Sequence, residues 1–144
     1  MSTAELLALA SRYRETLRHS VYLSRSLDTE GELSTTQTSI LNMVAAGPAR
    51  VSSIARNLGI KVPSATQAVI KLEAAGLLAR TQDTADARAV LVSLTAAGDA
   101  SLRAANHRRN SVMAAALAAL TPEERAAIEA AIPAMGKLSG PGLP

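Results

Sequence analysis

The stretch "VSSIARNLGIKVPSATQAVIKLEAAGLL", residues 51–78, contains two helical patterns separated by a tight turn. The first pattern begins at Ser52 and ends at Gly59. The second begins near Pro63, which suits the first position of a helix, and ends at Gly76, which favours a left-handed C-cap. In both patterns apolar residues recur at helical spacing. Those expected to face the core are Ile54, Ala55, Leu58, Ala65, Val69 and Leu72.

A β-hairpin is expected directly after these two helices. The segments "LLARTQ" (77–82) and "AVLVSL" (89–94) flank the polar stretch 83–88, and apolar residues alternate along the second segment. Two such segments around a polar turn are typical of antiparallel strands. Arg88 stands at the expected tip, just before a strand that needs no charge. The formation of the hairpin therefore does not explain why an arginine is placed there.

Further helices are expected before this region. Residues 1–27 carry apolar side chains at helical spacing, and residues 28–34 form a loop. Ser34 and Gln37 match a capping box, in which each side chain bonds the other residue's backbone N–H. The helix that they open is expected to end at Gly47.

Two helices are expected after the hairpin. Thr95 is placed to cap a helix that runs to about Leu120, and Thr121 opens the last helix with "TPEE". Pro133 is expected to kink that helix or end it early, because proline lacks the N–H that helix propagation uses. Residues 137–144 are expected to form a flexible tail.

Length and composition limit the class of protein. A chain of 144 residues corresponds to one domain, and 48% hydrophobic with 1% aromatic residues predicts a core of small aliphatic side chains. The absence of cysteine excludes disulfides, thiolate metal sites and a thiol redox switch, and it fits a cytoplasmic protein. No apolar run approaches the roughly 20 residues that cross a bilayer, so a soluble chain without a membrane partner is expected.

The net charge of +3 is unevenly distributed along the chain. Residues 50–90 hold six basic and three acidic residues, whereas the rest of the chain holds nine of each. A segment that carries all the excess positive charge is a candidate for binding a polyanion. The alternative, a solvated surface with chance asymmetry, stays open on charge alone.

The order of elements in the middle of the chain is that of a winged helix-turn-helix. A short supporting helix and a turn precede a longer helix whose polar face fits the major groove of DNA. The hairpin is then the wing, and an arginine at its tip can enter the minor groove, where the negative potential is concentrated. This explains Arg88 as a residue placed for DNA.

The sequence resembles the MarR family of bacterial transcription regulators. By motif the resemblance covers about residues 33–100, and by the order and length of elements it covers the whole chain. The wing shows the family's spacing of an Asp, an Arg, a strand ending in Leu-Thr, and a Gly. The segments and residues that carry the resemblance are "LSTTQTSIL", "SSIARNLGI", "KLEAAGLLAR", Asp86, Arg88, Leu94, Thr95 and Gly98.

The resemblance implies a mainly α fold with a small β-hairpin. Residues 33–98 would form the winged helix-turn-helix, and residues 1–27 and 95–136 would form helices that interleave in an obligate homodimer. The implied function is that of a transcriptional repressor that binds a pseudo-palindromic operator in double-stranded DNA. No cofactor is implied.

Candidate DNA-binding residues follow from this reading, and an ordinary solvated surface is the alternative for each. Arg88 is the main candidate, with Asp86 orienting it or the wing turn, and Arg80 either binds DNA or serves as a structural ion-pair partner. Ala87 stands where many relatives have a basic residue. Ile70 replaces an acidic residue and either touches a thymine methyl group or packs. The remaining candidates are Ser64, Thr66, Gln67 and Lys71 for bases, and Ser53, Arg56 and Lys61 for phosphates.

A ligand site is implied less specifically. The family often binds small aromatic acids in a crevice between the dimer helices and the winged domain, where the candidates here are Tyr13, His19, Tyr22 and Met43. Packing is the alternative for each of them. An anionic effector could use Arg103, Arg108 or Arg109, or these could form an exposed helical face. The two histidines lie far apart in the sequence, so no metal site is expected.

Two other functions compete with DNA binding. A winged helix can bind protein, although such a module would not need an arginine at the tip of its wing. An enzyme is not expected, because the sequence shows no nucleophile–base pair, phosphate loop or metal-ligand cluster.

Overall fold

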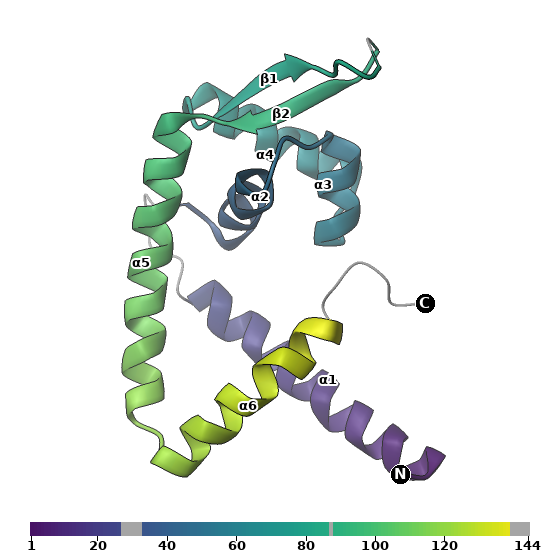
Figure 1. Cartoon of the computed structure of the whole chain (residues 1–144), viewed down its shortest axis with the longest axis vertical. Helices are drawn as coiled ribbons and strands as arrows, with labels where there is room; N and C mark the ends of the chain where they lie inside the picture. Colours follow the sequence, from purple (N-terminus) through teal and green to yellow (C-terminus); the bar gives the residue numbers. More distant parts are fainter. Residues whose placement is uncertain (27–32, 87, 139–144) are drawn as a thin grey trace.

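The computed structural model describes residues 1–26, 33–86 and 88–138 (Figure 1). The expected class, mainly α with a small hairpin, is confirmed. The long helix α5 joins a winged domain, made of α2 to β2, to the crossed helices α1 and α6 at its other end (Figure 1). The elements are α1 (Thr3–Ser26), α2 (Thr35–Ala45), α3 (Val51–Leu58), α4 (Val62–Ala74), β1 (Leu78–Gln82), β2 (Val90–Leu94), α5 (Ala96–Ala118) and α6 (Pro122–Leu138).

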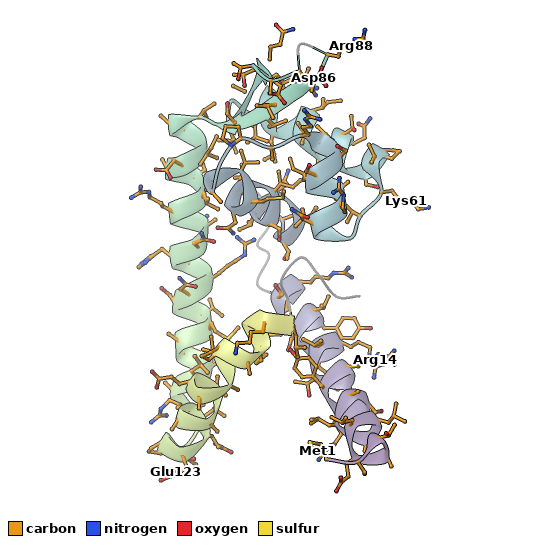
Figure 2. All side chains as sticks on the ribbon, turned by 45° about the vertical axis from the view of Figure 1, so that its right-hand side comes forward. Met1, Arg14, Lys61, Asp86, Arg88 and Glu123 are labelled. Atoms are coloured by element: carbon orange, nitrogen blue, oxygen red, sulfur yellow. The ribbon has the colours of Figure 1, made fainter. Side chains whose placement is uncertain are left out.

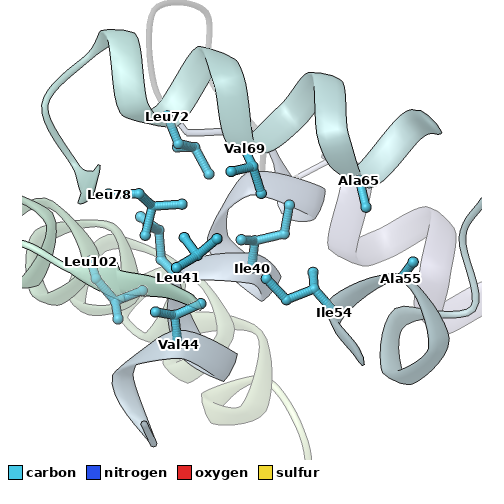
Figure 3. Close-up of a cluster of buried hydrophobic side chains, with 11 residues drawn as sticks. Ile40, Leu41, Val44, Ile54, Ala55, Ala65, Val69, Leu72, Leu78 and Leu102 are labelled. Carbon is cyan, nitrogen blue, oxygen red and sulfur yellow. The ribbon is translucent and has the colours of Figure 1, made fainter. Parts of the chain in front are cut away.

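The hydrophobic core lies inside the winged domain. Figure 3 shows side chains of α4 pointing toward those of α2 and α3, with Leu102 of α5 beside them. Ile40, Ile54 and Val69 are completely buried. Five of the six residues predicted to face inward are buried, and Leu58 is half-buried at the edge of the cluster. As the composition indicates, the buried side chains of this cluster are aliphatic in the part of the chain that the structure describes.

Local sequence signals set the ends of the helices. Ser34 and Gln37 form both bonds of the predicted capping box, and Thr95 caps α5 by accepting a 3.0 Å bond from the N–H of Gly98. Gly59 has a φ of 64° and Gly76 a φ of 75°, the left-handed region in which glycine avoids a steric cost. Each predicted boundary in the winged domain is therefore correct to within a few residues.

The hairpin is an antiparallel pair whose register runs from Leu78 opposite Leu94 to Gln82 opposite Val90. A further bridge joins Ala49 to Val92, with N–O distances of 3.0 and 2.8 Å between their backbones. The segment before α3 is thereby hydrogen-bonded to the second strand, which ties the wing to the helix-turn-helix.

The start of α5 is in close contact with the base of the wing. The N–H of Thr95 donates to the carbonyl of Leu77 at 3.2 Å, and the Thr95 hydroxyl donates to the carbonyl of Gly76 at 2.6 Å. A Cβ at Gly98 would lie 2.1 Å from that same Leu77 oxygen. Glycine is therefore required at residue 98 by close packing, since its φ is ordinary.

The prediction for the C-terminal helix needs correction. Helix α6 does not end at Pro133 but continues to Leu138. The carbonyl that loses the hydrogen bond of the missing Pro133 N–H belongs to Glu129, an exposed residue. Lys137 and Leu138, placed in a flexible tail by the sequence, are helical, and residues 139–144 lie outside the described part, as do residues 27–32 of the predicted loop.

Candidate nucleic-acid interface

The turn between α3 and α4 presents a cation at the start of α4. Gly59 reverses the chain, and the N–H of Ile60 donates to the carbonyl of Ala55 at 3.0 Å. Lys61 is the N-cap residue of α4, and Figure 2 shows its side chain projecting from the turn. Because free backbone N–H groups at a helix N-terminus favour anions, Lys61 and the end of α4 together suit a phosphate.

The outer face of α4 carries the predicted base-reading residues. Ser64, Gln67 and Lys71 are exposed, and Thr66 is half-buried with its hydroxyl donating to the carbonyl of Val62 at 2.9 Å. The inward face of the same helix packs on the core (Figure 3). All four side chains therefore lie on the surface of α4 outside the core, while their contact with bases stays a prediction.

The phosphate candidates on α3 lie at different depths. Arg56 is exposed in the last turn of α3, close in sequence to the Gly59 turn, whereas Ser53 is half-buried in the middle of the helix. Arg56 is thus placed with Lys61 around one turn, and Ser53 can offer only part of its surface.

The tip of the wing is shaped by Asp86. Its carboxylate Oδ1 accepts a 3.0 Å bond from the N–H of Arg88, and its carbonyl accepts a 3.0 Å bond from the N–H of Ala89. Arg88 is exposed and extends outward from the tip (Figure 2). The predicted role of Asp86 in the wing turn matches this geometry. Ala87, between the two, lies outside the described residues.

An ion pair that the sequence did not predict supports the wing from below. Arg50 Nη2 lies 2.7 Å from Asp83 Oδ2, and Asp83 Oδ1 accepts from the N–H of Ala85 at 2.9 Å. Only 13% of the Asp83 side chain is exposed. Its hydrogen bond with Arg50, followed by that with Ala85, holds the pKa of the Asp83 carboxyl below its usual value. The same pair raises the pKa of Arg50.

Arg80 forms the ion pair that was one of its two expected roles, and its contact with DNA stays a prediction. Its Nε lies 2.6 Å from Oε1 of Glu73, so the first strand is tied to the end of α4. The pair is partly exposed, with 39% and 29% of the two side chains accessible, and contributes little stability by itself. A DNA contact by Arg80 would have to use its other guanidinium nitrogens.

The structure does not gather the four predicted ligand residues into one pocket. Tyr13 is half-buried in an apolar groove between α1 and α6, whereas His19 and Tyr22 are exposed on α1. Met43 lies on α2, where its sulfur accepts a 3.9 Å bond from Asn57. Among the predicted anion-binding arginines, Arg103 pairs with Asp99 at 2.9 Å on the exposed face of α5.

A polar pocket that the sequence did not predict lies between α2 and α5. Asn106 Nδ2 donates to Asn42 Oδ1 at 3.0 Å, and Arg109 Nη2 donates to the carbonyl of Leu33 at 2.5 Å. Of the ligand-binding candidates named from the sequence, only Arg109 lines it. The available signal was the helical spacing of four polar residues on α2, namely Thr35, Thr38, Ser39 and Asn42. The lining residues are Ser24, Thr35, Thr38, Ser39, Asn42, Asn106, Arg109, Asn110 and Met113.

The described residues contain no group of three or more His, Cys, Asp or Glu that could hold a metal ion. In the same part of the chain, every helix is too short or too polar to cross a membrane.

The comparisons with known proteins agree with this geometry. The MarR family model matches residues 33–90. The chain is 37% identical over 78 residues to the HTH-type transcriptional repressor MdtR of Bacillus subtilis (strain 168); the match covers 54% of this chain and 50% of that protein, so it spans half of the relative's length.

Solved structures resemble the chain over nearly its whole length. The transcriptional regulator BldR from Sulfolobus solfataricus is 26% identical, with a TM-score of 0.77, and the match covers 96% of this chain and 97% of that one. A MarR family protein from Bacillus stearothermophilus has the same fold at 19% identity, with a TM-score of 0.74 and 95% and 96% of the two chains covered. The wing, the turn and the helix order thus agree with the match of residues 33–90 to the MarR family model and with the likeness of the whole chain to BldR.

Proposed function

We propose that this protein is a transcriptional repressor that binds a specific operator in double-stranded DNA. The observation that carries the proposal is the common exposure of the outer face of α4 and of Arg88 at the wing tip. Figure 2 shows Lys61 and Arg88 both projecting from the winged domain on the side away from α5. A helix that reads the major groove and a wing arginine that enters the minor groove need this arrangement.

The proposed active form is a homodimer. In the described part of the chain, neither α1 nor α6 buries a residue, although both carry large apolar side chains. Apolar surface of this extent is stabilised by a partner, and a second copy of α1 and α6 supplies a matching one. The exposed residues concerned are Leu6, Leu7, Leu9, Leu17, Val21, Ile128, Ile132 and Leu138.

We propose that a small effector binds in the polar pocket between α2 and α5. Its side chains offer hydroxyl, amide and guanidinium groups, a set that suits a small carboxylate better than a purely apolar molecule. A ligand there would contact both the winged domain and the helix that leads to the dimer region, so it could favour one spacing of the two wings.

The deciding experiment is selection of DNA from a randomised duplex library by the full-length protein, followed by gel retardation. We expect a converged palindromic sequence, retention against excess random DNA, and a scattering mass of two chains. A library that does not converge would favour the alternative, a winged helix that binds protein. A mass of one chain would contradict the homodimer.

A further inference from the structure

The outer face of α4 carries two parallel rows of side chains, each with a spacing of four residues. One row contains Gln67 and Lys71, whose groups are polar or charged. The other contains Val62, Thr66 and Ile70. Residues four apart on a helix are surface neighbours, with Cβ atoms about 5–6 Å from each other. The second row therefore forms a continuous strip beside the polar one.

This strip presents methyl groups to the outside of the protein. Val62 is 49% exposed and Ile70 is 45% exposed, and neither belongs to the core cluster on the other face of α4. Thr66, between them, donates its hydroxyl proton to the carbonyl of Val62 at 2.9 Å. Because that proton is already bonded within the helix, the strip offers apolar contact rather than a hydrogen-bond donor.

The surroundings of the strip decide what covers it. Lys61 is exposed before Val62, and Lys71 is exposed after Ile70, so cations stand at both ends. A protein partner that buried the strip would have to desolvate or pair these two charges. The major groove of DNA satisfies both requirements, because phosphates line its edges and the C5-methyl group of thymine is the apolar group on its floor.

We propose that Val62 and Ile70 determine specificity by contacting thymine methyl groups in each operator half-site. This rests on the proposed function, in which α4 enters the major groove. The two residues are eight positions apart, or about 12 Å along the helix axis. At roughly 3.4 Å per base-pair step, a helix lying along the groove reaches thymines about three to four base pairs apart.

The test uses the duplex that the full-length protein selects from a randomised library. Each thymine is replaced in turn by deoxyuridine, which removes only the C5-methyl group. Two thymines in each half-site are expected to matter, with affinity falling about fourfold for each one replaced, as expected when one methyl-sized group is no longer buried. The other thymines should tolerate the replacement.

Two variants assign the effect to the strip. In Ile70→Ala the thymine–deoxyuridine difference should vanish at one position and persist at the other. Gln67→Ala, from the neighbouring row, should keep both differences while losing preference elsewhere. Equal affinity of the unaltered protein for thymine and deoxyuridine duplexes would overturn the inference but leave DNA binding intact, as would an Ile70→Ala protein that keeps both differences.

Two further outcomes are distinguishable. A library that does not converge would overturn the proposed function and this inference with it. An Ile70→Ala protein whose mass in size exclusion falls from two chains to one would show that Ile70 covers a protein interface, and the inference would be wrong.

Discussion

The Oδ1 atom of Asp86 accepts a 3.0 Å hydrogen bond from the backbone N–H of Arg88. A side chain thus fixes the turn that carries the arginine, while the guanidinium itself stays exposed. The two residues consequently have separable roles, since Asp86 sets the shape of the wing tip and Arg88 supplies its charge.

Loss of the charge should weaken DNA binding without changing stability. Arg88→Ala opens no cavity, so its free energy of unfolding should stay within about 0.5 kcal/mol of the parent. The negative slope of log K against log salt should become shallower by about two, one for each wing of the homodimer. Preference for A·T-rich flanks should also change. Fluorescence anisotropy over a salt series measures this. Arg103→Ala removes an equal charge from the exposed face of α5 and should bind normally.

Loss of the hydrogen bond that fixes the wing turn should weaken DNA binding, because Arg88 is then no longer held in position. Asp86→Ala removes the acceptor for the Arg88 N–H, whereas Asp86→Asn keeps an oxygen in that place. We expect Asp86→Ala to lose most of the affinity that Arg88→Ala loses and Asp86→Asn to lose little, measured on the selected operator. If both variants bind equally, the hydrogen bond does not position the arginine.

The Arg50–Asp83 pair predicts an acid sensitivity of the wing. The pKa of Asp83 is lowered in the folded protein, first by its bond with Arg50. A lowered folded-state pKa stabilises the wing above the usual aspartate pKa of about 3.9, and that stability is lost as pH falls through the lowered value. NMR titration of the Asp83 carboxyl should give a midpoint below about 3.9. In Arg50→Met the midpoint should rise, and an unchanged midpoint would exclude the ion pair in solution.

Substitution of Gly98 and of Gly136 by alanine should have opposite effects on stability. A methyl group at Gly98 meets the Leu77 carbonyl, so Gly98→Ala should cost roughly 3 kcal/mol, at the upper end for overpacking. Gly136 lies in α6 with nothing within 4 Å of its added Cβ, so Gly136→Ala should stabilise by about 0.5–1 kcal/mol. Denaturant unfolding at one protein concentration compares the two. A Gly98→Ala protein as stable as the parent would show that α5 can shift away from the wing.

The elements that the sequence predicted correctly are those with local causes. Ser34, Gly59 and Thr95 each act on backbone within a few residues, so their capping and turn signals are visible in the sequence. Pro133 misled because a proline in a helical pattern predicts an end of the helix, whereas α6 continues through it to Leu138.

The parts that were missed depend on contacts between distant segments. Arg50 and Asp83 lie 33 residues apart, and the Ala49–Val92 bridge joins the segment that carries Arg50 to the hairpin that carries Asp83. The polar pocket likewise needs the packing of α2 against α5, across which Asn42 and Asn106, 64 residues apart, form a hydrogen bond. The sequence shows which residues are charged and which carry amides, but it does not show which of these side chains are in contact in the fold.

Helix α5 is long enough to convert a small tilt at the wing into a large displacement at its far end. Thr95 and Gly98 hold one end of it against the base of the wing, and its 23 residues carry the other end to α6. At 1.5 Å per residue the arm is about 35 Å long, so a tilt of about 5° displaces the far end by roughly 3 Å. That displacement is close to one base-pair step of about 3.4 Å. A small rotation at the wing base is therefore enough to move the proposed dimer out of step with its operator.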